Sequence, residues 1–226
     1  MTDPSLSDGQ RFIAGAPAHR VTDTYVGVLS AALGTGVAGI AAAAYYSTDL
    51  RPLAHTYGIW VLFAFAVASA RPLRAALLAS TTFLGTSVVV FFIGVKMFHD
   101  LKWGAAGSTL GVSWDRMALW LILAVPAGLL LGLAGYAAVR NGWRGDISRA
   151  AVIGVLAAEA FDRVLDYGFS DVAVLLAIGA AVGLLVHFRA SGLRLRRTIA
   201  VTPLTLMCSL LLLSAPDFLE QLIALG

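Results

Sequence analysis

The chain has 226 residues, of which 59% are hydrophobic and only 13% are charged, and its formal net charge at pH 7 is +3. A soluble domain of this length is rarely so apolar, so the composition excludes a typical soluble fold and predicts an integral membrane protein. The single cysteine, Cys208, excludes an intrachain disulfide and a zinc site built from cysteines.

Apolar runs bounded by charge predict seven membrane-spanning helices, because several of them reach the ~20 residues that cross a hydrocarbon core. Residues 1–23 form a polar segment without the apolar stretch of a cleaved signal peptide. Residues 24–214 are expected to form one all-α polytopic transmembrane bundle, and residues 215–226 a short external amphipathic tail. The spans are predicted at about Thr24–Ser47, Leu53–Ser69, Ala75–Val95, Met117–Val139, Ile147–Tyr167, Val172–Phe188 and Thr198–Ser214.

Basic residues predict the orientation of this bundle, because short cytoplasmic loops are enriched in Lys and Arg. Most of them precede the first span or follow the second, fourth and sixth spans, and these segments share one side of the membrane. The residues concerned are Arg11, Arg20, Arg71, Arg74, Arg140, Arg144, Arg149, Arg189, Arg194, Arg196 and Arg197. The amino terminus is therefore predicted inside and the carboxyl terminus outside. The fifth segment must then cross the membrane despite its charges, and residues 96–116 become an outer loop.

The stretch "AAEAFDRVLDYGFSD", residues 157–171, concentrates charge in the fifth predicted span. Glu159, Asp162, Arg163 and Asp166 follow the spacing i, i+3, i+4, i+7, which places them on one face of a helix. A charged group facing lipid near the bilayer centre is unfavourable by ~2.5–3.5 kcal/mol. This face must therefore point into the bundle or into water, and the four residues are the predicted ligand- or ion-binding site on the outer half of the bundle.

Three interpretations of this stretch remain open. Glu159 and Arg163 have the i,i+4 order of a favourable ion pair, so the face is either an ion-paired, wetted part of a span or a polar site for a cation, a proton or a basic ligand. The third interpretation makes it the end of a loop. If the pair is buried, removing one partner is expected to destabilise the protein more than replacing both with apolar residues.

Two short motifs of small residues resemble each other. "GVAGIAAA", residues 36–43, lies in the first predicted span, and "GLAGYAAV", residues 132–139, lies in the fourth. Small residues let membrane helices approach closely, and the two spans are predicted to be antiparallel, as in transporters with inverted repeats. Chance is the better explanation in a chain this rich in Gly and Ala. Pro126 is expected to kink or break the fourth span.

Catalytic and cofactor-binding motifs are not found in the sequence. Its four histidines do not form the facing intramembrane pairs of a haem site, and no HExxH motif or phosphate-binding glycine loop occurs. "EAFDR" has the Glu-x-x-x-Arg spacing of the intramembrane proteases related to CAAX processing, but their Phe-x-x-x-His and His-x-x-x-Asn motifs do not follow it. No catalytic residue, metal or cofactor is therefore expected.

The chain resembles a family of small actinobacterial multi-pass membrane proteins catalogued as a domain of unknown function. The resemblance covers residues 24–185 and is carried by "YGIWVLFAFAVASARPLRAALLA", "WLILAVPAGLLLGLAGYAAVR" and "VLAAEAFDRVL". It implies a small multi-pass architecture and leaves the activity open.

The leading functional hypothesis is a non-enzymatic transport or ligand-binding protein of a bacterial plasma membrane. Its expected partners are the lipid bilayer and a cation or basic ligand on the outer side, and no nucleic acid. The alternative is an accessory or structural subunit of a larger membrane complex, such as an exporter or immunity assembly, with another membrane subunit as its partner. An intramembrane enzyme is the least favoured hypothesis.

Overall fold

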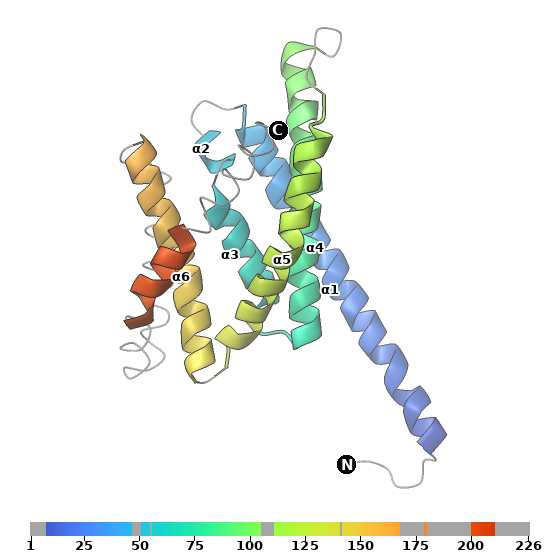
Figure 1. The fold of residues 1–226 in the computed structure, drawn as a ribbon. Coiled ribbons are helices and arrows are strands. Elements are labelled where there is room, and N and C mark those ends of the chain that lie inside the picture. The colour runs from blue at the N-terminus through green and yellow to red at the C-terminus, as the bar shows by residue number, and fades with distance from the viewer. Residues whose placement is uncertain are drawn as a thin grey trace.

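A computed structural model describes residues 8–46, 51–54, 56–104, 111–140, 142–167, 179 and 200–210. Within these ranges every regular element is an α-helix, which confirms the all-α prediction for the described part of the chain (Figure 1). The helices are α1 (Asp8–Ala44), α2 (Arg51–Ala54), α3 (Tyr57–Ala68), α4 (Leu73–Trp103), α5 (Trp114–Ala138) and α6 (Trp143–Tyr167), with a further apolar helix at Ala200–Leu210.

Three helical segments are long and apolar enough to cross a membrane: Asp23–Ala44 within α1, and the whole of α4 and α5. Large apolar side chains project from these helices and are mostly exposed. On α1 and α5 the most exposed of them are Tyr25, Val28, Ile40, Ile122 and Leu130. Lipid tails accept such a surface, whereas water does not, so the exposed faces are consistent with a membrane location.

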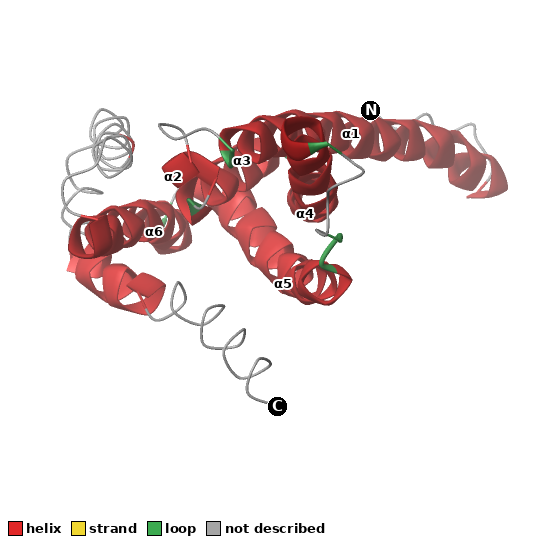
Figure 2. Cartoon of the chain, turned by 90° about the horizontal axis from the view of Figure 1, so that it is seen from above, coloured by secondary structure: helices red, strands yellow, loops and turns green. Residues whose placement is uncertain are grey.

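Helices α1 and α4 pack side by side and run in the same direction (Figures 1 and 2). Gly34 permits the close approach, because a Cβ atom added there would lie 2.7 Å from the Phe83 carbonyl oxygen. At the same level the Ser87 hydroxyl donates a 3.3 Å hydrogen bond to the Gly34 carbonyl. Further along, a Cβ atom on Gly94 would lie 2.8 Å from that of Ala42. Small side chains therefore form this contact, as expected for helices packed in lipid.

Helix α5 packs against α3 and α4 through one face of glycines. A Cβ atom added to Gly128 would lie 2.6 Å from Thr81 Cα of α4, and one added to Gly135 would lie 2.7 Å from the Ala68 Cβ of α3. Gly36 and Gly39 of α1 differ, because nothing in the described structure lies within 4 Å of a Cβ added to either. Within the described structure the glycines of the two similar motifs therefore differ in their packing.

The second predicted span is not a continuous helix, and this corrects the sequence prediction. The structure divides the segment into α2, of four residues, and α3, of 12 residues. Between them Thr56 has φ −95° and ψ 116°, an extended conformation that ends one helix before the next begins. At ~1.5 Å per residue, α3 is ~18 Å long, which is too short to cross a ~30 Å hydrocarbon core alone.

The boundaries of the predicted outer loop were also wrong. Residues 96–116 were expected to be a loop, yet α4 continues to Trp103 and α5 begins at Trp114. The side chains of Lys96 and Asp100 form an i,i+4 ion pair that supports this extension. Pro126 lies within the helix α5, so it does not break the fourth predicted span, and the predicted kink stays a prediction.

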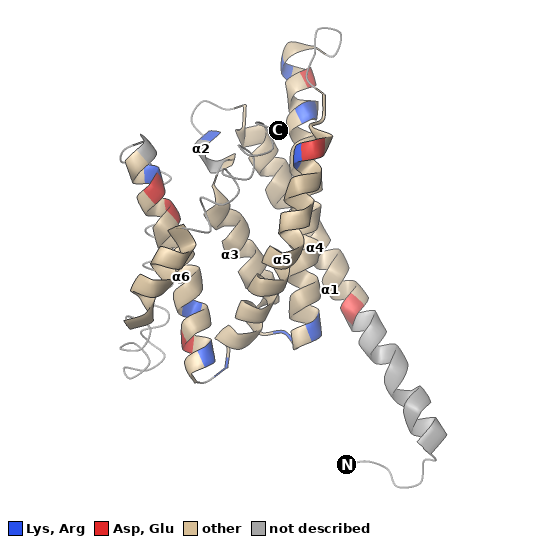
Figure 3. Cartoon of the chain, viewed as in Figure 1, with Lys and Arg blue, Asp and Glu red and all other residues tan. Residues whose placement is uncertain are grey.

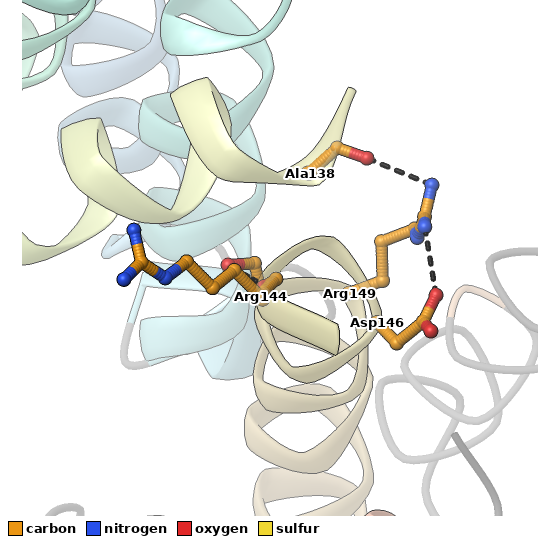
Figure 4. A network of polar contacts seen from close by, with 5 residues as sticks. Ala138, Arg144, Asp146 and Arg149 are labelled. Atoms are coloured by element: carbon orange, nitrogen blue, oxygen red, sulfur yellow. Dashed lines mark hydrogen bonds and ion pairs between the residues drawn. The ribbon is translucent and has the colours of Figure 1, made fainter. Parts of the chain in front are cut away.

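The turn from α5 into α6 is stabilised by the polar network in Figure 4. Arg149 of α6 donates a 2.7 Å hydrogen bond to the Ala138 carbonyl, at the carboxyl end of α5, and a 3.0 Å hydrogen bond to Asp146. A cation at this position complements the partial negative charge of a helix carboxyl terminus. On the same helix, Gly154 lies against Thr205, whose hydroxyl donates to the Ala150 carbonyl at 3.1 Å. These contacts join α6 to the end of α5 and to the helix at Ala200–Leu210.

The described helices cover some of the predicted spans and not others. The first and fourth overlap α1 and α5 except for their last residues, the third lies within α4, and the fifth lies within α6. Because of its charged residues, α6 is not among the three helices apolar enough to be candidate spans. The sixth predicted span, apart from residue 179, and the tail at 215–226 lie outside the described residues, and the seventh is described only over Ala200–Leu210.

Candidate functional site

The break between α2 and α3 is the first part of the candidate site. The first N–H groups of a helix have no acceptor within that helix, so each must be satisfied by another group when it is buried. Thr56, at the N-cap position of α3, is fully buried, and its side chain makes no capping hydrogen bond. Gly58, in the first turn, is also buried. The start of α3 therefore needs an acceptor from elsewhere in the protein.

Glu159 of α6 supplies that acceptor. Its Oε1 accepts a 2.6 Å hydrogen bond from the backbone N–H of Tyr57, and its Oε2 accepts one from the backbone N–H of Gly58. These bonds join residues 102 and 101 positions apart in the sequence. The carboxylate is 1% exposed, and it lies where the α3 dipole places partial positive charge. Charge-assisted hydrogen bonds of this kind are about twice as strong as neutral ones.

The four residues predicted from the sequence have different positions. Arg163 is largely buried and places its Nη2 3.8 Å from Glu159 Oε1, within the range of an ion pair but beyond that of a hydrogen bond. Asp162 is exposed on the same helix. Asp166 lies in the last turn of α6, and its side chain is outside the described part of the structure. The structure thus brings Glu159 and Arg163 together and turns Asp162 outward.

This geometry changes the expected effect of substituting both Glu159 and Arg163 on stability. An isolated ion pair can be replaced by two apolar residues with little loss, because both charges are removed together. Here the nearest partners of Glu159 are two backbone N–H groups of α3, which substitution at Arg163 does not remove. The pair is therefore part of a three-way contact between α6 and the start of α3.

Apolar and aromatic contacts hold the three elements of the site in place. Phe65 of α3 packs against an apolar cluster on α6 that consists of Val152, Ile153, Leu156 and Ala160. The ring of Tyr57 stacks on Trp120 of α5, with centroids 5.7 Å apart. The Glu159 carboxylate is consequently presented to the start of α3 by a packed scaffold and not by a loop.

Sequence reasoning missed the α3 half of this site. Thr is a frequent N-cap residue, and Pro52 lies within α2, so "RPLAHTYG" contains signals for a helix start near Thr56. The hydropathy of the segment outweighed them in the prediction. Tyr57 and Trp120 carry no signal of their own, because their roles depend on α3, α5 and α6 meeting in space.

A second polar and aromatic cluster lies at the end of α1 and α4. Rings of Tyr46 and Trp103 meet edge to face with centroids 5.4 Å apart, and Lys102 Nζ lies 4.8 Å from the Trp103 centroid. Burial, and then the neighbouring Tyr45 and Asp100, raise the pKa of the Tyr46 phenol. Because the platform already holds the cation of Lys102, it is typical of an aromatic anchor at the membrane interface. In the described residues no three His, Cys, Asp or Glu side chains gather as a metal site would require.

Comparisons with known proteins identify a family without a known activity. Residues 15–219 match the model of a family described as "Family of unknown function (DUF6518)". No curated protein and no solved structure matches the chain.

Proposed function

We propose that this chain, which belongs to the DUF6518 family of unknown function, is a non-enzymatic multi-pass protein of the plasma membrane that binds or transports a small cation. The site is the polar region where the break before α3 meets α6, on the outer half of the bundle. The proposed residues are Glu159, Asp162, Arg163 and Asp166 of α6; Glu159 is buried against α3 beside Arg163, and the exposed Asp162 gives the site an acidic face. With three carboxylates and one guanidinium, the four residues together attract a cation more than an anion.

One observation carries the proposal: a short helix begins inside an apolar bundle, and a buried carboxylate from another helix caps it. Non-helical backbone at membrane depth is tolerated where protein covers it or where it lines a polar cavity. Discontinuous helices of this kind form the substrate and ion sites of many transporters. A structural bundle does not need the break, because a continuous helix satisfies its own N–H groups.

The proposed topology has seven spans, the amino terminus in the cytoplasm and the carboxyl terminus outside. The turns from α3 to α4 and from α5 to α6 lie at the same end of the bundle as the amino-terminal half of α1, and basic residues gather at both turns (Figure 3). The opposite end also carries Lys and Arg, but there they lie among more acidic residues (Figure 3). The charge balance of the two ends therefore supports the positive-inside prediction. The break and Glu159 belong to the opposite, outer end.

Thiol labelling tests this topology. In a Cys208→Ser background, we expect Trp114→Cys and Gly226→Cys to react with a membrane-impermeant maleimide in intact cells. We expect Trp143→Cys to react only after permeabilisation, because the α5–α6 turn is placed inside. Trp114 is the first residue of α5, and Trp143 is the first residue of α6, just after the other end of α5. Both side chains are exposed, so thiols at these positions are accessible to the reagent. Labelling of 114 and 143 from the same side would contradict the crossing of α5, and a protected 226 would contradict an odd number of spans.

Cation flux tests the function. Proteoliposomes with an internal pH-sensitive dye are diluted into Na⁺, K⁺ or choline chloride, and entry of a cation in exchange for protons makes the lumen alkaline. We expect one of these cations to produce this signal and Asp162→Asn to slow it, because the substitution removes a negative charge from the acidic face. Asp115→Asn is the matched control, since Asp115 is an exposed carboxylate on α5 outside the proposed site. Signals no larger than those of protein-free liposomes with all three cations would reject exchange of these ions.

A small-residue face of α1, which no residue of the described structure covers at Gly36 and Gly39, favours a second candidate function. Gly36 and Gly39 lie one helical turn apart, and no described atom lies within 4 Å of a Cβ added to either. Such a face permits close packing of another membrane helix. An accessory subunit of a larger membrane complex would use it to contact its partner, and this role needs no flux through the polar site.

A further inference from the structure

Both oxygens of the Glu159 carboxylate accept hydrogen bonds from α3. Oε1 receives the Tyr57 N–H and Oε2 receives the Gly58 N–H. An ionised carboxylate accepts at both oxygens, whereas a protonated carboxyl carries an O–H donor on one of them. A proton on either oxygen turns that oxygen into a hydroxyl, which is a weaker acceptor, and it removes the negative charge that the helix dipole stabilises. The ionised form therefore satisfies the two N–H groups better than the protonated form does.

We propose that Glu159 is a proton-binding site and that its protonation releases the amino-terminal end of α3 from α6. This inference rests on the proposed function, because it names the proton as one ion that the polar site binds. The carboxylate acts as a latch. When it is ionised it holds the break closed, and when it is protonated the first turn of α3 loses its charged acceptor.

The groups around Glu159 allow both the ionised and the protonated form of its carboxyl group. On α6, the positive charge of Arg163 favours the ionised form and the negative charge of Asp162 disfavours it. From α3 the contacting groups are the two backbone N–H groups, and the only titratable side chain among these residues, Tyr57, has its ring stacked on Trp120 of α5. Asp162 is exposed next to the buried carboxylate, so a charged group that can exchange protons with water lies within one turn.

Packing restricts the movement to one end of α3. The apolar cluster on α6 contacts α3 through Phe65, which is two turns beyond the capped N–H groups. Loss of the cap leaves this contact and the stacking of Tyr57 on Trp120 of α5 in place, so the start of α3 can move relative to α6 while its later turns stay docked. The proposed change is a pivot of α3 and not an unfolding of the bundle.

The experiment measures the α3–α6 distance against pH by electron paramagnetic resonance, which does not depend on a substrate. Spin labels replace the exposed Leu62 of α3 and Phe161 of α6 in full-length protein in nanodiscs, with Cys208→Ser. Infrared difference spectra on the same samples follow the carbonyl band of a protonated carboxyl group, and loss of that band in Glu159→Gln assigns it. A reference pair at Val28 of α1 and Ile93 of α4 reports whether the bundle stays folded.

We expect the 62–161 distance to shift over the same pH range in which the Glu159 band appears, while the 28–93 distance stays constant. Glu159→Gln, which keeps one acceptor and replaces the other with a donor, should show the acid distance at every pH. A constant 62–161 distance while the band appears, or no Glu159 band at any pH, would overturn the proposal. If Glu159→Gln disturbs the 28–93 pair, Glu159→Asp assigns the band instead, by shifting its frequency, and the pH series of the protein with Glu159 intact decides. Cation flux without a shift in the 62–161 distance would reject the release of α3 and leave the proposed function standing. A shift in that distance without cation flux would reject the proposed function and leave the release of α3 standing.

Discussion

Glu159→Ala is expected to reduce the free energy of unfolding by about 3–5 kcal/mol, the range for removing one partner of a buried charged contact. The substitution leaves the N–H groups of Tyr57 and Gly58 without their acceptor, and it leaves the buried Arg163 without the carboxylate beside it. Because folded proteins are stable by only ~5–15 kcal/mol, this is a large share of the total. Equilibrium unfolding in mixed detergent micelles, followed by circular dichroism, measures the loss.

Two further variants of α6 test whether the loss of stability comes from the contact of Glu159 with α3. Asp162→Ala removes an exposed carboxylate three residues away and is expected to change stability by less than about 1 kcal/mol. Glu159→Ala combined with Arg163→Met should remain nearly as destabilised as Glu159→Ala alone, because the α3 N–H groups stay unsatisfied. Recovery of most of the stability in the double variant would show that the ion pair, and not the cap on α3, accounts for the effect.

Gly128→Ala is expected to destabilise the protein by about 1–3 kcal/mol, the usual range for inserting a methyl group into a packed contact. The new Cβ would lie 2.6 Å from Thr81 Cα and 3.0 Å from Thr81 N, so the backbone of α4 must move. A flexible side chain could rotate away, but backbone within a helix cannot. The same unfolding measurement in micelles reports the change.

Gly36→Ala is the matched control for this prediction, since it makes the same chemical change in the similar motif of α1. Nothing in the described structure lies within 4 Å of its added Cβ, and Ala has a higher helix propensity than Gly by ~1 kcal/mol. We therefore expect no loss of stability. Equal destabilisation by both substitutions would show that the packing of α5 on α4 is not the cause.

The sequence predicted the helices whose signals are local. Long apolar runs located α1, α4 and α5, and the i, i+3, i+4, i+7 spacing correctly put the charged stretch on a helix. The extension of α4 to Trp103 was also readable, because Lys96 and Asp100 have helical spacing, but the charges there were interpreted as a loop. These errors concern element boundaries, which depend on a few residues against a strong apolar background.

The site could be predicted only in part, for a different reason. Glu159 and Arg163 were identified because a charge in an apolar helix needs a partner. The partner at i+4 was the one that the sequence could suggest. The N–H groups of Tyr57 and Gly58 are backbone atoms on another helix, and backbone groups carry no sequence signal. A contact between segments about one hundred residues apart depends on how α3 and α6 pack.

The separation between the two halves of this contact also has a consequence for the order of events during synthesis. Gly58 leaves the ribosome 101 residues before Glu159. At ~5–20 residues per second, the start of α3 then waits about 5–20 seconds for its acceptor. During that interval a helix too short to cross the membrane has exposed N–H groups that hydrocarbon cannot satisfy. Until α6 arrives, the nascent chain must keep this end at the watery surface or beside the insertion machinery. The final position of α3 is thus fixed late, by a residue of the last long helix described.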